Sequence, residues 1–157
     1  MAPPALPPRA PGLANRRPLR VVDVAMFYGE RSGGIRTYLE AKARYAANTG
    51  EFEHHLVIPG KTTVSDGTGR HEHRSLRLAA SNGYRVPLGG SDLQATLYAL
   101  DPDVVLMHDP FWTPRLASRA AHQLGAAVIA VHHSSAALHA AGLPGPHAFY
   151  ERALKRW

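Results

Sequence analysis

Short apolar runs alternate with helical stretches along most of this chain, and this alternation limits the folds open to it. Four runs have the composition of β-strands: residues 19–25, 55–58, 104–107 and 127–131. Three stretches between them have the spacing or the end signals of helices: residues 34–48, 91–100 and 113–124. Strands that alternate with helices are typical of a parallel sheet. We therefore predict an α/β fold with a parallel sheet and helices on both faces.

The middle of the chain carries weaker signals. Residues 61–69 are rich in Thr, Ser, Asp and Gly and lack periodicity, so we expect a loop there. Residues 71–78 and 84–87 lean towards β-structure, which favours a third strand in this part. Ser91 or Asp92 stands where a side chain could cap the helix that ends at Leu100.

Composition narrows the class of protein. A chain of 157 residues fits one domain, and the absence of Cys excludes disulfides and thiol catalysis and agrees with a cytoplasmic protein. The net charge of +6 favours anionic partners such as phosphorylated ligands or lipid headgroups. The basic residues are not interleaved with aromatic ones, so we expect no nucleic-acid partner. Residues 1–18, with six prolines, are expected to be a disordered Pro/Arg-rich tail and not a secretion signal.

Polar clusters follow three of the predicted strands. Ser32-Gly33-Gly34 comes after the first strand, His108-Asp109 after the strand at 104–107, and His132-His133-Ser134 after the strand at 127–131. Ligands of open parallel sheets bind outside the carboxyl ends of the strands, so we expect these clusters to converge. The histidines and Asp109 could also ligate zinc or manganese, but no strand end carries a spaced His pair, and we predict no metal.

The glycines suggest a phosphate-binding turn. Without Cβ atoms, Gly33 and Gly34 can adopt positive φ and let a ligand approach the backbone at the start of a helix. A strand-to-helix turn can also need glycine for steric reasons alone. Arg36, one turn inside the helix, could face a phosphate or simply be solvated.

These clusters, in this order and spacing, resemble the N-terminal domain of the retaining glycosyltransferases of family 4. The similar elements are Ser32-Gly33-Gly34 followed by Ile35-Arg36-Thr37-Tyr38-Leu39, Pro102-Asp103-Val104-Val105 followed by His108-Asp109-Pro110, and Val131-His132-His133-Ser134-Ser135. The resemblance covers about residues 20–157 and implies the first, Rossmann-like lobe of a GT-B fold.

The resemblance also implies roles for single residues. Gly33, Gly34 and Arg36 would border the diphosphate of a nucleotide-sugar donor. His133 would lie beside the transferring sugar, with His132 as the adjacent alternative. His108, Asp109 and Ser134 would line the acceptor side of the cleft. The donor would be a UDP- or GDP-sugar, with no permanently bound cofactor and no metal.

The resemblance stops short of a whole enzyme. The family's second lobe has no counterpart in these residues, and the last strand of the first lobe is missing, because residues 149–157 resemble the helix that leads into it. We therefore expect a domain over residues 19–157 that is truncated before its last strand and inactive alone. Its parent enzyme would glycosylate a lipid, a polysaccharide or a small molecule, with peripheral contact at the inner membrane face. The alternatives are a non-catalytic nucleotide- or phosphate-binding module and a metal-dependent hydrolase.

Overall fold

The computed structural model describes residues 17–26, 28–29, 33–77, 85–87, 89–108, 113–133, 146, 148–149 and 152. Strands and helices follow one another in these residues as β1 (Leu19–Val24), α1 (Gly33–Thr49), β2 (Phe52–Gly60), β3 (Val64–Ser65), β4 (Arg70–Arg77), β5 (Arg85–Pro87), α2 (Ser91–Leu100), β6 (Val104–Met107), α3 (Thr113–Leu124) and β7 (Ala127–Ala130).

The described strands form a mostly parallel sheet in the order β3-β4-β2-β1-β6-β7, and β5 pairs with β4. β1 lies between β2 and β6 and is parallel to both. β4 and β7 extend the parallel part on either side, while the short strands β3 and β5 are antiparallel to β4. The predicted α/β, Rossmann-like fold is confirmed.

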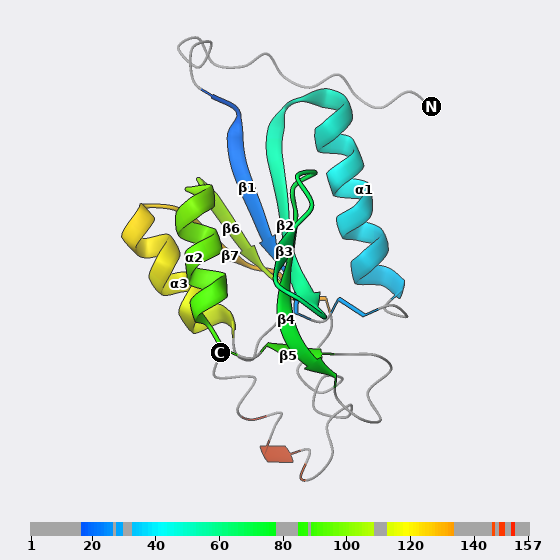
Figure 1. Ribbon diagram of the computed structural model, residues 1–157, viewed down its shortest axis with the longest axis vertical. Coiled ribbons are helices and arrows are strands. Elements are labelled where there is room, and N and C mark those ends of the chain that lie inside the picture. The colour runs from blue at the N-terminus through cyan, green and yellow to red at the C-terminus, as the bar shows by residue number, and fades with distance from the viewer. Residues whose placement is uncertain are drawn as a thin grey trace.

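Helices cover both faces of the sheet, with α1 on one side and α2 and α3 on the other (Figure 1). Alternate residues of a strand point to opposite faces, so each face has its own apolar core. Val22 and Val24 of β1 pack in the core that includes Leu97 of α2. Leu56 and Leu39 belong to the core beneath α1. The prediction of helices on both faces is therefore correct.

Left-handed residues close the helices. Gly50, with φ 64°, ends α1, and its N–H donates to the carbonyl of Ala46 at 2.9 Å. Asp101 ends α2 with φ 46°, and its N–H donates to the carbonyl of Leu97 at 3.0 Å. At the start of α2, the residue in the N-cap position is Gly90, and no side chain caps the helix. The expected cap by Ser91 or Asp92 is wrong, because both residues are already inside the first turn.

Other predicted boundaries hold to within a few residues, with two differences. The expected loop at 61–69 contains the two-residue strand β3, because Val64 and Ser65 pair with the outer edge of β4. The strand predicted at 127–131 is β7, and all four of its residues are exposed although they are apolar. The helix expected over residues 146–157 falls almost wholly outside the described residues. Of the described helices, none combines the length and the apolar character that crossing a membrane requires.

Candidate functional site

The carboxyl ends of β1, β6 and β7 lie side by side at one edge of the sheet. The register pairs Val24 of β1 with Met107 of β6, and Met107 with Ala130 of β7. His108 follows Met107, and its N–H donates to the carbonyl of Val24 at 3.0 Å. His133 lies three residues beyond Ala130, and α1 begins at the same edge (Figure 1). The sheet thus brings together two of the histidines singled out from the sequence.

His108 and His133 are in direct contact. Nδ1 of His108 lies 2.7 Å from Nε2 of His133, and the two rings stack at 4.9 Å with 19° between their planes. His108 is only 3% exposed, whereas His133 is exposed. The ring of Tyr38, from α1, lies 6.2 Å from that of His108 and 6.0 Å from that of His133. A buried imidazole therefore supports a solvent-facing one beside the first turns of α1.

A buried carboxylate lies beneath this pair. Asp23, in the middle strand β1, is fully buried, and its Oδ1 lies 2.7 Å from Nε2 of His108. Its Oδ2 lies 2.5 Å from Nε2 of His54 on β2 and 2.8 Å from Nζ of Lys42 on α1. Asp23, Lys42, His54, His108 and His133 form what we call the Asp23 cluster. Donors surround both oxygens of the carboxylate, which is the condition for burying a charge.

The environment keeps Asp23 ionised. Burial by itself would raise the pKa of Asp23, but hydrogen bonds from His108 and His54 and the nearby ammonium of Lys42 outweigh it. The pKa of Asp23 is therefore held well below its ordinary value. The Lys42 side chain is 16% exposed, so the ammonium that balances the carboxylate is itself largely withdrawn from water.

Sequence reasoning did not single out Asp23, Lys42 or His54. The available signals were a carboxylate within an otherwise apolar strand and a lysine in phase with the buried face of a helix. Lys42 lies three residues after Leu39 and four before Ala46, and both of those residues are buried in α1. A charge at such a position needs a buried partner.

The glycines of the predicted phosphate turn are the first two residues of α1. Both are exposed, and a Cβ added to Gly33 or Gly34 would meet no atom within 4 Å. Neither has a positive φ, so the backbone here does not use the special freedom of glycine. Arg36 is paired with Glu40, with 2.7 Å between Nε and Oε1, and its guanidinium lies 5.8 Å from the ring of Tyr28.

The remaining predicted site residues contribute less to this geometry. His132 is exposed at the same edge. Asp109 and Ser134 lie outside the described residues, as does Ser32. In the described part of the chain, no three His, Asp or Glu side chains are grouped so as to hold a metal ion.

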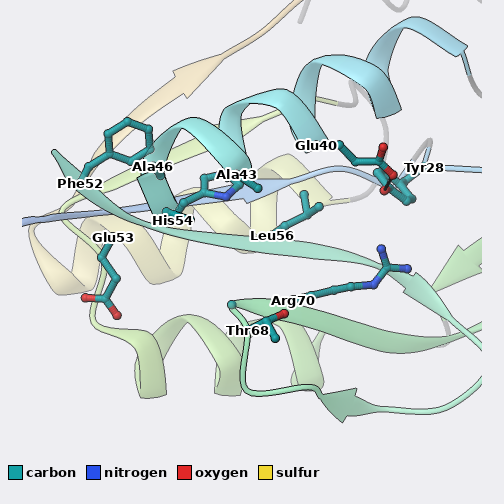
Figure 2. Close-up of a pocket in the computed structure, with 12 residues that line it drawn as sticks. Tyr28, Glu40, Ala43, Ala46, Phe52, Glu53, His54, Leu56, Thr68 and Arg70 are labelled. Carbon is teal, nitrogen blue, oxygen red and sulfur yellow. Dashed lines mark hydrogen bonds between the residues drawn. The ribbon is translucent and has the colours of Figure 1, made fainter. Parts of the chain in front are cut away.

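A cavity of about 420 Å³ lies between α1 and strands β2 and β4 (Figure 2). Its apolar side is formed by Ala43, Ala46, Phe52 and Leu56, among others. His54, whose Nε2 contacts Asp23, belongs to its lining. At the end formed by Tyr28, Glu40 and Arg70, the Tyr28 hydroxyl lies 3.1 Å from Oε1 of Glu40. This cavity follows the first half of β2 and is distinct from the strand-end edge that carries His108 and His133.

Comparison with known proteins relates part of the chain to a mycobacterial protein. No protein-family model matches the chain. Over 120 residues, the chain is 32% identical to proteins from two strains of Mycobacterium tuberculosis, H37Ra and CDC 1551, both described as GDP-mannose-dependent alpha-(1-6)-phosphatidylinositol dimannoside mannosyltransferase. The match covers 73% of this chain but only 30% of the length of these relatives. The similarity supports a relationship to glycosyltransferases.

Proposed function

We propose that this chain is the N-terminal, acceptor-side domain of a glycosyltransferase that moves a sugar from a nucleotide-diphosphate donor to a hydroxyl group. The observation that carries the proposal is the 32% identity, over 120 residues, to a mycobacterial mannosyltransferase. The fold agrees with it, because polar side chains gather where a parallel α/β sheet binds ligands. In this proposal a second lobe completes the donor site, and the chain alone transfers little or no sugar.

The start of α1 is the place we propose for the donor diphosphate. The N-terminus of a helix offers N–H groups and the positive end of the helix dipole to an anion. The open space around Gly33 and Gly34 lets a phosphate approach the backbone closely. Arg36 could add a charge if the donor draws it away from Glu40. Because the relatives use GDP-mannose by description, we favour a GDP-sugar over a UDP-sugar.

His133 is the residue we propose beside the transferring sugar, with His132 as its neighbour and alternative. An imidazole in this place can hydrogen-bond a sugar or acceptor hydroxyl and so orient the reacting groups. His108, Asp109 and Ser134 complete the acceptor side in this proposal. Transfer would retain the anomeric configuration and use no metal, in keeping with the family 4 resemblance.

A lipid is the acceptor class that we favour. The description of the relatives names a phosphatidylinositol dimannoside, and this chain carries a net charge of +6. Positive charge attracts a protein to anionic headgroups. We propose that the enzyme works in the cytoplasm, at the inner face of the membrane.

Sugar transfer by the complete gene product tests the proposal. Purified protein is incubated with radiolabelled GDP-mannose or UDP-glucose and a membrane lipid extract, and label in the lipid phase is measured. We expect transfer from the GDP-sugar, and we expect His133→Ala combined with Gly34→Val to reduce it at least a hundredfold, or about 3 kcal/mol. His122→Ala, an exposed histidine on α3, is the matched control and should keep wild-type activity.

Two results would contradict the proposal. Undiminished transfer by the His133→Ala/Gly34→Val protein would remove these residues from the site. Absence of transfer, together with micromolar nucleotide affinity of the isolated chain in calorimetry, would favour a non-catalytic nucleotide-binding module.

A further inference from the structure

Three side chains connect the interior of the sheet to the solvent-facing edge. Oδ1 of Asp23 is 2.7 Å from Nε2 of His108, and Nδ1 of His108 is 2.7 Å from Nε2 of His133. The three residues belong to three neighbouring segments of the sheet: β1, the end of β6 and the end of β7. Pairing of β1, β6 and β7 therefore fixes the order of these contacts.

The chemistry of Asp23 gives the contacts a direction. An ionised carboxylate only accepts hydrogen bonds, so Nε2 of His108 must carry a proton and donate it. In a neutral imidazole the other nitrogen is then an acceptor, which makes Nδ1 of His108 the acceptor for His133. Nε2 of His133 must therefore donate, and in the neutral ring Nδ1 of His133 is unprotonated. The buried charge determines the tautomer of an exposed ring two contacts away.

The other described groups around Asp23 leave the path through His108 intact. Nζ of Lys42 lies 3.0 Å from Oδ1 and 2.8 Å from Oδ2 of Asp23, so the ammonium already balances the carboxylate. His54 contacts Oδ2 and leaves the path through Oδ1 untouched. The ring of Tyr38 lies 6.2 Å from that of His108 and 6.0 Å from that of His133.

We propose that Asp23 is a positioning residue which acts through His108 to hold the neutral ring of His133 in the tautomer with an unprotonated Nδ1. His133 then accepts a hydrogen bond from a hydroxyl of the sugar or the acceptor and does not donate one. The identity of that hydroxyl rests on the proposed function, whereas the tautomer can be observed without any substrate. At metal sites, removal of a carboxylate that orients a ligating histidine typically changes metal affinity or activity by about 10 to 100-fold, and we expect an effect of at least tenfold here.

Nitrogen NMR of the ¹⁵N-labelled chain tests the tautomer directly, since protonated and unprotonated ring nitrogens have well-separated shifts. Above the pH at which imidazoles titrate, we expect His108 and His133 each to carry their proton on Nε2 alone. In Asp23→Asn, one amide oxygen must serve three donors, and we expect a second tautomer of His133. If that variant does not fold, His108→Gln interrupts the same path and should also release His133 into two tautomers.

His54→Gln is the matched control, because it removes another contact to Asp23 without interrupting the path. It should leave His133 in its single tautomer. A proton on Nδ1 of His108 in the wild-type chain, or a single unchanged tautomer of His133 in His108→Gln, would overturn the proposal. In the complete gene product, Asp23→Asn should lower kcat at least tenfold at unchanged KM for the donor, and an unchanged kcat would also overturn it. A wild-type protein that shows these tautomers but transfers no sugar contradicts the proposed function alone.

Discussion

Replacing Lys42 with Met removes the cation from the Asp23 cluster while keeping an unbranched side chain of similar length in α1. Met has good helix propensity, so the helix itself should not suffer. The change leaves a fully buried carboxylate with the imidazoles of His54 and His108 as its described side-chain partners. We expect a large loss of stability, because a buried charge without a countercharge is among the costliest defects in a protein.

The distances set the size of this loss. Unit charges separated by the 2.8 Å between Nζ of Lys42 and Oδ2 of Asp23 attract each other by about 6 kcal/mol at an effective dielectric constant of about 20. Part of this attraction offsets the desolvation of the ammonium, which the variant no longer needs. His54 and His108 still donate to the carboxylate. The net loss should therefore be about 3 kcal/mol, at the lower end of the range for broken buried ion pairs.

Urea denaturation followed by circular dichroism at about pH 8 measures the loss of unfolding free energy. Lys61→Met, in an exposed loop, is the control and should change stability by less than about 0.5 kcal/mol. Combination with Asp23→Asn should show a coupling of at least about 1 kcal/mol. The reasoning would be refuted if Lys42→Met lowered the free energy of unfolding by less than about 0.5 kcal/mol, or if Lys42→Met and Asp23→Asn showed no coupling.

Three further changes test other parts of the fold by urea denaturation. Gly69→Ala should lower the free energy of unfolding by about 2 to 3 kcal/mol, because φ is 90° and a Cβ would lie 2.5 Å from the carbonyl oxygen of His54. Gly67→Ala, with φ 76° in open space, is the control and should lower it by only about 1 kcal/mol. Equal losses in the two variants would contradict this reasoning. Burial lowers the pKa of His73 from its ordinary 6.5, so the unfolded chain binds the proton more readily and stability should fall as the pH drops below that value. His73→Gln should flatten this part of the plot of unfolding free energy against pH. An unchanged plot would contradict the assignment to His73. Leu97→Ala, fully buried against β1, should cost about 3 kcal/mol, and a loss under about 1 kcal/mol would mean that the core refills.

The parts of the fold that the sequence predicts well are those with one dominant local signal. β6 has the predicted bounds, because its apolar run directly follows the turn at 101–103 and is too short to form a helix. The position of α1 was predictable from its helical spacing and from Gly50, which closes it in the left-handed conformation. Where propensity and packing agree, local patterns are sufficient.

Two strands towards the edges of the sheet were harder to predict, because packing there outweighs local preference. β4 is mostly charged residues and histidines, yet it pairs in parallel with β2 and places His73 and Ser75 in buried positions. The reverse holds for β7, whose apolar residues are exposed at the sheet edge. Burial in these two strands depends on their place in the sheet order, which single residues do not reveal.

The candidate site was predictable only at its strand ends. The rule that ligands meet strand ends led to His108 and His133, and the structure places their rings in contact. The carboxylate beneath them was missed, because Asp23 belongs to a strand interior and its partners Lys42 and His54 come from other elements. Such a cluster exists only after the sheet and α1 have assembled.

The sequence separations within the Asp23 cluster have a consequence for the order of folding. Lys42 and His54 lie 19 and 31 residues from Asp23, inside the β1-α1-β2 unit, whereas His108 is 85 residues away. Short loops close at lower entropic cost, so the local unit can neutralise the carboxylate before β6 arrives. Until then, we expect the open edge of β1 to present a half-solvated charge, and charges on an edge strand discourage pairing with a strand from another molecule. β6 brings His108, a further donor to the carboxylate, so its arrival completes the contacts around Asp23.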